Sequence, residues 1–159
     1  MPKLQDEVGK RQPFDLAEEE AYLNIKRTSA MLESVFGRLF RKHGLSEATY
    51  NVLRILRPAG EGGRCWTEIR EHLVVPVPDV TRLIDRLERS GHAERVRSAD
   101  DRRKVYVRIT SKGLELVNSL DAPARGLLRD RLGHLSQDEL RTLSGLLERL
   151  RDVLGPGAE

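Results

Sequence analysis

The chain has 159 residues, of which 33% are charged, 38% hydrophobic and 4% aromatic, and its formal net charge is +3. This length suits one domain with an extension and is sufficient to bury a core. The charges are too evenly balanced for a long acidic or basic tail to be the main feature. No apolar run approaches the roughly 18 residues that a membrane helix needs. The single cysteine excludes an internal disulfide framework and a multi-cysteine zinc site. We expect a mostly helical protein, and because no secretory signal opens the sequence we expect it to be cytoplasmic.

Basic residues gather in the middle of the chain. Between Arg64 and Lys112 there are 12 basic and 8 acidic residues, a net charge of +4, whereas the remainder carries −1. Ten of the 12 basic residues are arginine, whose planar guanidinium group suits phosphates and guanine edges. This excess favours a nucleic-acid partner, although a net charge of +4 is also found on ordinary solvated surfaces.

A long helix is predicted after a polar N-terminal arm. Residues 15–18 have the spacing of a capping box, and apolar side chains then recur every three or four positions until Gly44. This pattern predicts a helix of about 28 residues. Ser46 is placed to cap a second helix that ends before Pro58, and a flexible loop is expected at residues 60–63.

The next segment predicts two helices that are separated by a proline-rich break. Thr67 is placed to cap the first helix, and Pro78 fits the first turn of the second, which Gly91 ends. The second helix has an apolar face within one third of its circumference, made of Val80, Leu83, Ile84 and Leu87. Its opposite face carries Pro78, Arg82, Asp85 and Arg89, with Thr81 and Arg86 at the flanks.

The periodicity then changes to that of strands. Residues 93–97 and 104–109 partly alternate, and the charged residues between them predict a hairpin tip. Thr110 is placed to cap a further helix, interrupted or bent near Pro123, and Ser136 opens another capping box. The last predicted helix carries a heptad seam of Leu140, Leu143, Leu147, Leu150 and Leu154.

This order of elements predicts a winged helix-turn-helix fold, mainly α with a small β-hairpin wing. We expect three regions along the chain. Residues 1–44 form an N-terminal arm and a long dimerisation helix, residues 45–110 form the DNA-binding domain, and residues 111–159 form C-terminal dimerisation helices. An apolar seam on a terminal helix requires a cover, either the first long helix or a partner chain.

Three motifs resemble the signature of the MarR family of transcriptional regulators. They are the helix at 79–91, the aspartate and two arginines at 101–103, and the stretch at 109–113. The resemblance covers residues 15–153 and implies a homodimer that binds DNA and usually represses transcription until a small molecule or an oxidant releases it. Two features depart from the family pattern. Ser98 and Ala99 replace the usual Asp-Pro of the wing, and the break before the second helix is unusually rich in proline.

From the motif and the helical faces we predict a set of DNA contacts in the major groove and through the wing. They are Pro78, Thr81, Arg82, Arg86, Arg89, Arg102 and Arg103. Asp101 is expected to orient the wing tip, and Asp85 to pair with Arg89 one helical turn later. The alternative is that the arginines of the helix only pair with acidic neighbours on a solvated face.

The resemblance also implies an effector cleft between the winged domain and the dimerisation helices. Its aromatic candidates are Phe36, Phe40, Tyr50 and Trp66, for which core packing is the alternative. Cys65 is expected to pack rather than to sense oxidants. The four histidines lack metal-ligand spacing, and motifs of the common enzyme classes are missing from the sequence. We therefore expect no catalytic activity, metal or cofactor.

The expected partners are a pseudo-palindromic double-stranded DNA operator, a second copy of the chain and a small lipophilic or aromatic effector, but no membrane. Two other functions stay open. The chain could be a winged-helix module that binds protein, or an architectural DNA-binding protein without an effector. Salt-sensitive affinity for DNA separates the first from a DNA-binding protein, because counterion release requires phosphate contacts.

Overall fold

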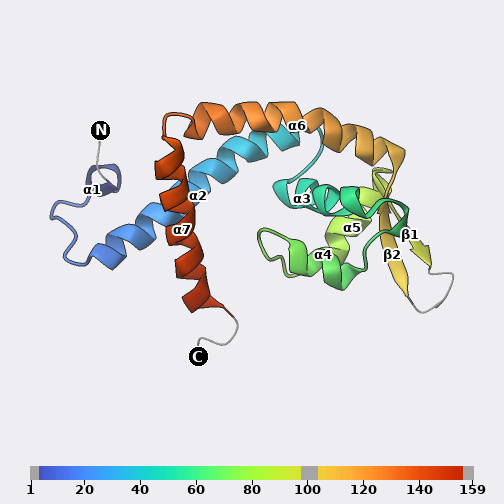
Figure 1. Cartoon of the computed structure of the whole chain (residues 1–159), viewed down its shortest axis with the longest axis horizontal. Coiled ribbons are helices and arrows are strands. Elements are labelled where there is room, and N and C mark those ends of the chain that lie inside the picture. Colours follow the sequence, from blue (N-terminus) through green and yellow to red (C-terminus); the bar gives the residue numbers. More distant parts are fainter. Residues whose placement is uncertain (1–3, 98–103, 156–159) are drawn as a thin grey trace. The chain divides into compact units, whose positions relative to one another are not determined.

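The computed structural model describes residues 4–97 and 104–155, and it confirms a mainly helical fold with a small β-hairpin (Figure 1). The chain divides into two compact units, Met1–Ser119 and Leu120–Glu159. The elements in chain order are α1 (Leu4–Glu7), α2 (Ala17–Arg41), α3 (Glu47–Leu56), the 3₁₀ helix η1 (Arg57–Gly62), α4 (Trp66–His72), α5 (Val80–Arg89), β1 (Ala93–Arg97), β2 (Val105–Ile109), α6 (Ser111–Leu132) and α7 (Gln137–Leu154).

The core of the first unit lies among α3, α4, α5 and the hairpin. Its fully buried side chains are apolar with one exception, Thr49, whose hydroxyl bonds to the Ser46 carbonyl. The apolar residues of this unit with the least exposure are Val52, Leu53, Leu56, Ile69, Ile84, Leu87, Val107 and Val117. Three of the four residues predicted for the apolar face of the second helix, Val80, Ile84 and Leu87, are buried, and Leu83 is half-buried.

The wing is an antiparallel pair in which Ala93 faces Ile109 and Arg97 faces Val105. Arg64 extends it through a bridge to Val107, and the two backbones exchange bonds of 2.9 and 2.8 Å. Gly63 makes this approach possible, because its φ is +66° and a Cβ there would lie 2.6 Å from the Val107 carbonyl oxygen. The strand that leads into α4 is thus fixed to the base of the wing.

The helix caps agree with the sequence at three positions and differ at three others. Ser46, Ser136 and Thr110 cap as expected, with Oγ accepting from the backbone N–H three residues later. The cap of α4 is Cys65 and not Thr67, because the Cys65 N–H donates to Glu68 at 2.8 Å. The remaining two helices, α5 and α2, depart from the predicted capping positions in different ways.

Asp79 caps α5 by accepting from the Arg82 N–H at 3.0 Å, so Pro78 lies before the cap and not in the first turn. The expected capping box at 15–18 does not form; α2 starts after Leu16 without a side-chain cap and ends at Arg41. Gly44 then takes a φ of +72° in the turn that follows. Residues 57–62 form a 3₁₀ helix where the sequence predicted the start of a flexible loop.

The second unit contains the end of α6 and all of α7. Pro123 lies inside α6, which continues without interruption to Leu132, contrary to the expected break. Helix α7 buries none of its residues, and Leu143, Leu146, Leu150, Val153 and Leu154 are exposed. No helix in the described ranges is long and apolar enough to cross a membrane.

Candidate nucleic-acid interface

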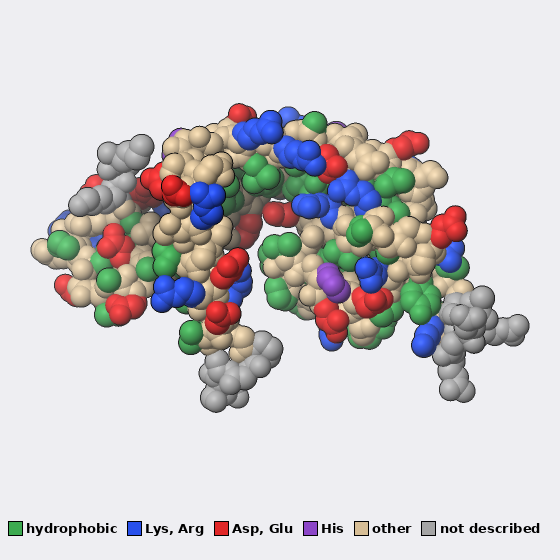
Figure 2. Space-filling view, in the orientation of Figure 1, with side chains coloured by type: hydrophobic (Ala, Val, Ile, Leu, Met, Phe, Trp, Pro, Cys, Tyr) green, Lys and Arg blue, Asp and Glu red, His purple; other side chains and the backbone are tan. Residues whose placement is uncertain are grey.

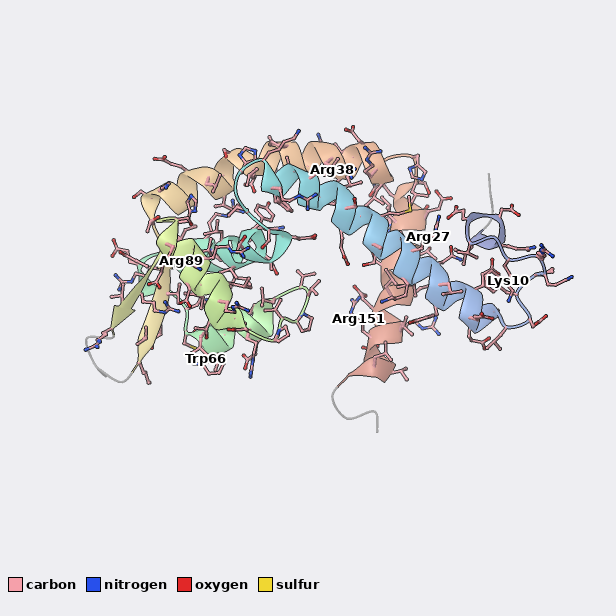
Figure 3. All side chains as sticks on the ribbon, turned by 180° about the vertical axis from the view of Figure 1, so that it is seen from behind. Lys10, Arg27, Arg38, Trp66, Arg89 and Arg151 are labelled. Atoms are coloured by element: carbon pink, nitrogen blue, oxygen red, sulfur yellow. The ribbon has the colours of Figure 1, made fainter. Side chains whose placement is uncertain are left out.

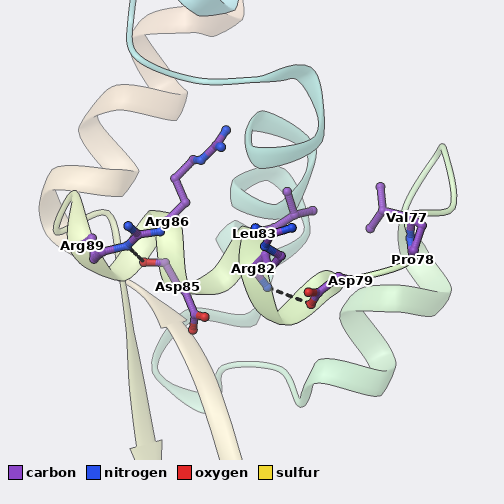
Figure 4. A pocket seen from close by; sticks show the side chains of 8 residues that line it. All are labelled: Val77, Pro78, Asp79, Arg82, Leu83, Asp85, Arg86 and Arg89. Atoms are coloured by element: carbon purple, nitrogen blue, oxygen red, sulfur yellow. Dashed lines mark hydrogen bonds between the residues drawn. The ribbon is translucent and has the colours of Figure 1, made fainter.

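The outer face of α5 borders a shallow cavity of about 520 Å³ (Figure 4). All of its lining residues belong to α5 or to the segment before it. They are Val77, Pro78, Asp79, Arg82, Leu83, Asp85, Arg86 and Arg89. Four predicted DNA contacts, Pro78 and the three arginines, are therefore brought together on one concave surface, and Thr81 is exposed on the same helix.

The three arginines of this cavity are exposed, and none of them has an ionic partner among the described residues. Arg82, Arg86 and Arg89 form no ion pair with any residue in the described part of the chain, although Arg89 Nε donates to the Asp85 carbonyl oxygen at 3.3 Å. The alternative that these side chains only pair with neighbouring carboxylates on a solvated face is thus not what the structure shows. Unneutralised guanidinium groups on a concave face suit an anionic ligand.

The carboxylates near this face are bound elsewhere, chiefly by Arg95 of β1. Its guanidinium group pairs with Asp85 at 2.6 Å and with Glu88, and its backbone N–H donates to Glu88 Oε1 at 2.9 Å. The expected pairing of Asp85 with Arg89 is wrong, because the Arg89 side chain bonds to the backbone of residue 85 instead. Arg95 thereby joins α5 to the wing and neutralises two carboxylates beside the three arginines.

Charge on the rest of the surface is mixed. Figure 2 shows acidic and basic side chains interspersed over the visible face, without a continuous basic sheet. A small basic surface on the outer side of one helix suits binding in the major groove of DNA.

Comparisons with known proteins decide the family. The sequence model of the MarR family matches residues 43–104, which include α3, α4, α5 and β1. The crystal structure of a MarR transcription factor from Planctomyces limnophilus is 39% identical, covers 86% of this chain and 98% of its own, and superposes with a TM-score of 0.65. The chain belongs to the MarR family. It is a DNA-binding transcriptional regulator.

Two further relatives agree with this MarR assignment. The homoprotocatechuate degradative operon repressor of Escherichia coli is 26% identical over 122 residues, 77% of this chain and 80% of the relative. Sco3205, a MarR family regulator from Streptomyces coelicolor solved in complex with DNA, has 20% identity and a TM-score of 0.79, covering 93% of this chain and 95% of its own. The second likeness establishes the shared fold.

Arg95 was not among the predicted site residues of this MarR regulator, because helical spacing predicts only pairs within one helix. Arg95 lies ten residues after Asp85 and seven after Glu88, on a different element. A basic residue on the strand after an acidic helix face is the signal that could have identified it. Thr110 and Lys112 also tie the start of α6 to the end of α5, donating to the carbonyls of Gly91 at 2.7 Å and Ser90 at 2.8 Å.

We predict that Arg95→Ala weakens both folding and DNA binding of the MarR regulator. Two half-exposed ion pairs and a hydrogen-bonded junction are lost, so the free energy of unfolding should fall by about 1–2 kcal/mol. Asp85 and Glu88 would then face DNA without a counter-charge. Thermal unfolding and operator titration would measure both effects. Arg54→Ala, an exposed arginine on α3, serves as the charge-matched control, and unchanged stability and affinity in Arg95→Ala would contradict the assignment.

The wing-tip residues predicted for this MarR protein, Asp101, Arg102 and Arg103, lie outside the described residues, as do Ser98 and Ala99. The two strands that carry the tip are described, and they pair in register up to Arg97 and Val105. The contribution of the tip to DNA binding is therefore a proposal that rests on the sequence.

Three of the four aromatic candidates for an effector cleft in the MarR protein lie together. Phe40 and Tyr50 stack with ring centroids 4.1 Å apart, and Phe36 lies 6.3 Å from Phe40. Phe40 and Tyr50 are buried and join α2 to α3. Trp66 lies on α4 (Figure 3), is half-exposed, and has the Arg70 guanidinium 5.3 Å from its ring.

Three titratable groups of the MarR domain have shifted pKa values near the helix ends: Glu68, His92 and Glu47, whose pKa is raised by burial and by nearby Glu33. The N–H and thiol of Cys65 bond to the Glu68 carboxylate and lower its pKa, with Arg64 contributing less. Burial lowers the pKa of His92, and nearby Lys112 lowers it further, while Ser90 Oγ lies 2.8 Å from its Nδ1. Because the folded pKa of His92 is below its unfolded value, its contribution to stability is present above the unfolded pKa and is lost as the pH falls below it.

Proposed function

We propose that this MarR-family regulator is a homodimeric repressor that binds a pseudo-palindromic operator through α5 and the wing. The observation that carries the proposal is the outer face of α5, where three arginines share one cavity without ionic partners in the described chain. DNA supplies phosphates and guanine edges to such a surface. The sign of regulation follows the E. coli relative, whose name describes an operon repressor.

Helix α5 is the element proposed to enter the major groove. Its apolar side is anchored in the core through Val80, Ile84 and Leu87, so the arginines can face DNA without leaving the core unpacked. We assign base-edge or phosphate contacts to Arg82, Arg86 and Arg89, with Thr81 and Pro78 beside them. A helix of this width fits the major groove of B-DNA, where arginine reads guanine by two hydrogen bonds.

The dimer is proposed from apolar surfaces that a single chain leaves exposed. Helix α7 presents Leu143, Leu146, Leu150, Val153 and Leu154, and α2 presents Tyr22, Ile25 and Met31. An apolar surface of this extent is typical of an interface. We therefore assign residues 1–44 and 111–159 to dimerisation and residues 45–110 to DNA binding. Two identical DNA-binding domains related by a two-fold axis match a DNA site with the same symmetry.

The proposed release mechanism is binding of a small lipophilic or aromatic effector. The stacked rings of Phe40 and Tyr50, with half-buried Phe36 beside them, offer an aromatic wall where α2 meets α3. Their close packing equally supports the alternative of a core cluster in a regulator without effector. A thermal-shift screen of aromatic acids and phenols, followed by operator titration in the presence of each hit, separates the two.

The test of DNA binding is selection of bound duplexes from a random pool, followed by titration at several salt concentrations. The account predicts enrichment of an inverted repeat and an affinity that falls steeply with salt. A chain that enriches no sequence and shows no salt dependence would instead be a protein-interaction module.

The wing gives a specific prediction in the same assay. If Arg103 contacts one phosphate in each half-site, Arg103→Ala should reduce the slope of log affinity against log salt by about 1.8. Because a narrow A·T-rich minor groove attracts arginine, the loss should be larger on an operator flanked by A·T than on one flanked by G·C. Asp101→Ala should reduce the salt slope and the preference for A·T flanks by less than Arg103→Ala does. A variant with the parent's slope and flank preference would show that the wing does not enter the groove.

A further inference from the structure

The cavity beside α5 is not uniformly polar. Val77 and Pro78, which precede the helix, and Leu83 on the helix are among its lining residues (Figure 4). Val77 and Leu83 are half-buried and Pro78 is exposed. Arg82 lies between these apolar side chains in sequence and lines the same cavity. An apolar surface and a guanidinium group without an ionic partner in the described part of the chain thus adjoin each other on the face that is assigned to DNA.

The combination of a guanidinium group with apolar side chains is more specific than phosphate binding requires. A phosphate contact needs only a cation or an N–H donor, and apolar side chains next to it contribute nothing. In the major groove, however, the edge of guanine accepts two hydrogen bonds from arginine, and thymine carries the only exposed methyl group, at C5. A guanine next to a thymine therefore offers the same pair of chemistries as Arg82 next to Val77 and Pro78.

We propose that Val77 and Pro78 form a contact surface for the 5-methyl group of a thymine in each half-site, adjacent to the base read by Arg82. The inference rests on the proposed entry of α5 into the major groove. It assigns a sequence-reading role to the proline-rich break, which precedes the helix and departs from the usual family pattern. Polar side chains in a turn could bond to phosphate, whereas the side chains of residues 74–78 are all apolar and can contact only apolar groups.

Deoxyuridine isolates the methyl group, because it pairs as thymine does and lacks only the C5 methyl. Each thymine of the selected operator would be replaced in turn, in both half-sites together, and affinity measured for the parent. Burial of one methyl group contributes about a fourfold gain in affinity, so the symmetric replacement should weaken binding about fifteenfold at one thymine position and have little effect at the others.

The protein side of the test uses Val77→Ala and a matched control in the same turn. Val74 is 81% exposed and does not line the cavity. Val74→Ala should therefore bind the selected operator and its deoxyuridine version as the parent does. In Val77→Ala the penalty for deoxyuridine should fall from about fifteenfold to about threefold or less, because the protein methyls that meet the thymine are gone. Val77→Thr keeps the shape of the side chain and serves if the alanine variant has a lowered Tm.

The outcomes separate this inference from the proposed function. A deoxyuridine penalty that is confined to one position per half-site and depends on Val77 supports methyl contact. No penalty at any thymine, or an equal penalty in parent and Val77 variants, overturns it. If deoxyuridine has no effect but Arg82→Ala still weakens operator binding, only the methyl contact fails. If neither change has an effect, α5 does not enter the major groove and the proposed function fails as well.

Discussion

Replacing Leu143 and Leu150 together with glutamate should convert the regulator from dimers to monomers. These side chains are 45% and 43% exposed in the single chain, so covering each one contributes about 1 kcal/mol, and the four in a dimer about 4 kcal/mol. Loss of that contribution raises the dimer dissociation constant about 1000-fold, and buried carboxylates would weaken association further. Sedimentation equilibrium at micromolar concentration measures the change directly.

The matched control for this experiment changes charge on another side of the same helix. Arg141→Gln with Arg149→Gln lowers the net charge by the same two units per chain, and both arginines are exposed. The control should stay dimeric and bind the operator as the parent does. Removal of residues 136–159 should likewise give monomers or aggregates without tight operator binding. A folded monomer with the parent's affinity, from either change, would refute the dimer proposal.

Arg82→Ala should be the most damaging single substitution on the DNA-binding face. One arginine that reads a base contributes about 1–3 kcal/mol of discrimination, and a dimer loses the contact in both half-sites, so affinity should fall at least about 30-fold. The Arg82 side chain is exposed, and its backbone N–H keeps its bond to Asp79, so thermal unfolding should be nearly unchanged.

The distribution of the loss over different DNA sequences identifies the type of contact. If Arg82 reads a base, Arg82→Ala should lose discrimination at one base pair in each half-site. If it contacts phosphate, all sequences should weaken alike and the salt slope should decrease. Arg125→Ala, which removes an exposed arginine from α6, should leave affinity unchanged. Operator affinity of Arg82→Ala equal to that of the parent would exclude both contacts.

Helical periodicity predicted the element order and the buried face of α5, because Val80, Leu83, Ile84 and Leu87 repeat with the period of a helix. The strand pairing followed from alternation on either side of a charged segment. Cap positions were less predictable. Several residues near a helix start can serve as the cap, and tertiary contacts decide which one does. The bridge between Arg64 and Val107 fixes the adjacent Cys65, which caps α4. The helix therefore begins at Trp66, one residue before Thr67.

For the part of the candidate site on α5, helical spacing predicted which side chains share a surface but not how their charges are paired. Facing positions on one helix identified Arg82, Arg86 and Arg89 correctly as neighbours on one surface. The partner of Asp85 was wrong because helical spacing describes only contacts within the helix. Arg95 reaches Asp85 through the fold of the hairpin against α5, and this is a tertiary contact that periodicity does not contain.

The most direct test of the account is the binding of the parent protein to its selected operator and to the same operator with five base pairs inserted between the half-sites. Half a helical turn places the two major-groove sites on opposite faces of the duplex, beyond the reach of a dimer with two fixed α5 helices. The account predicts two chains per operator and a fall in affinity, on insertion, to that for unrelated DNA. Chains that bind each half-site independently, with an affinity that is unchanged by the insertion, would contradict it.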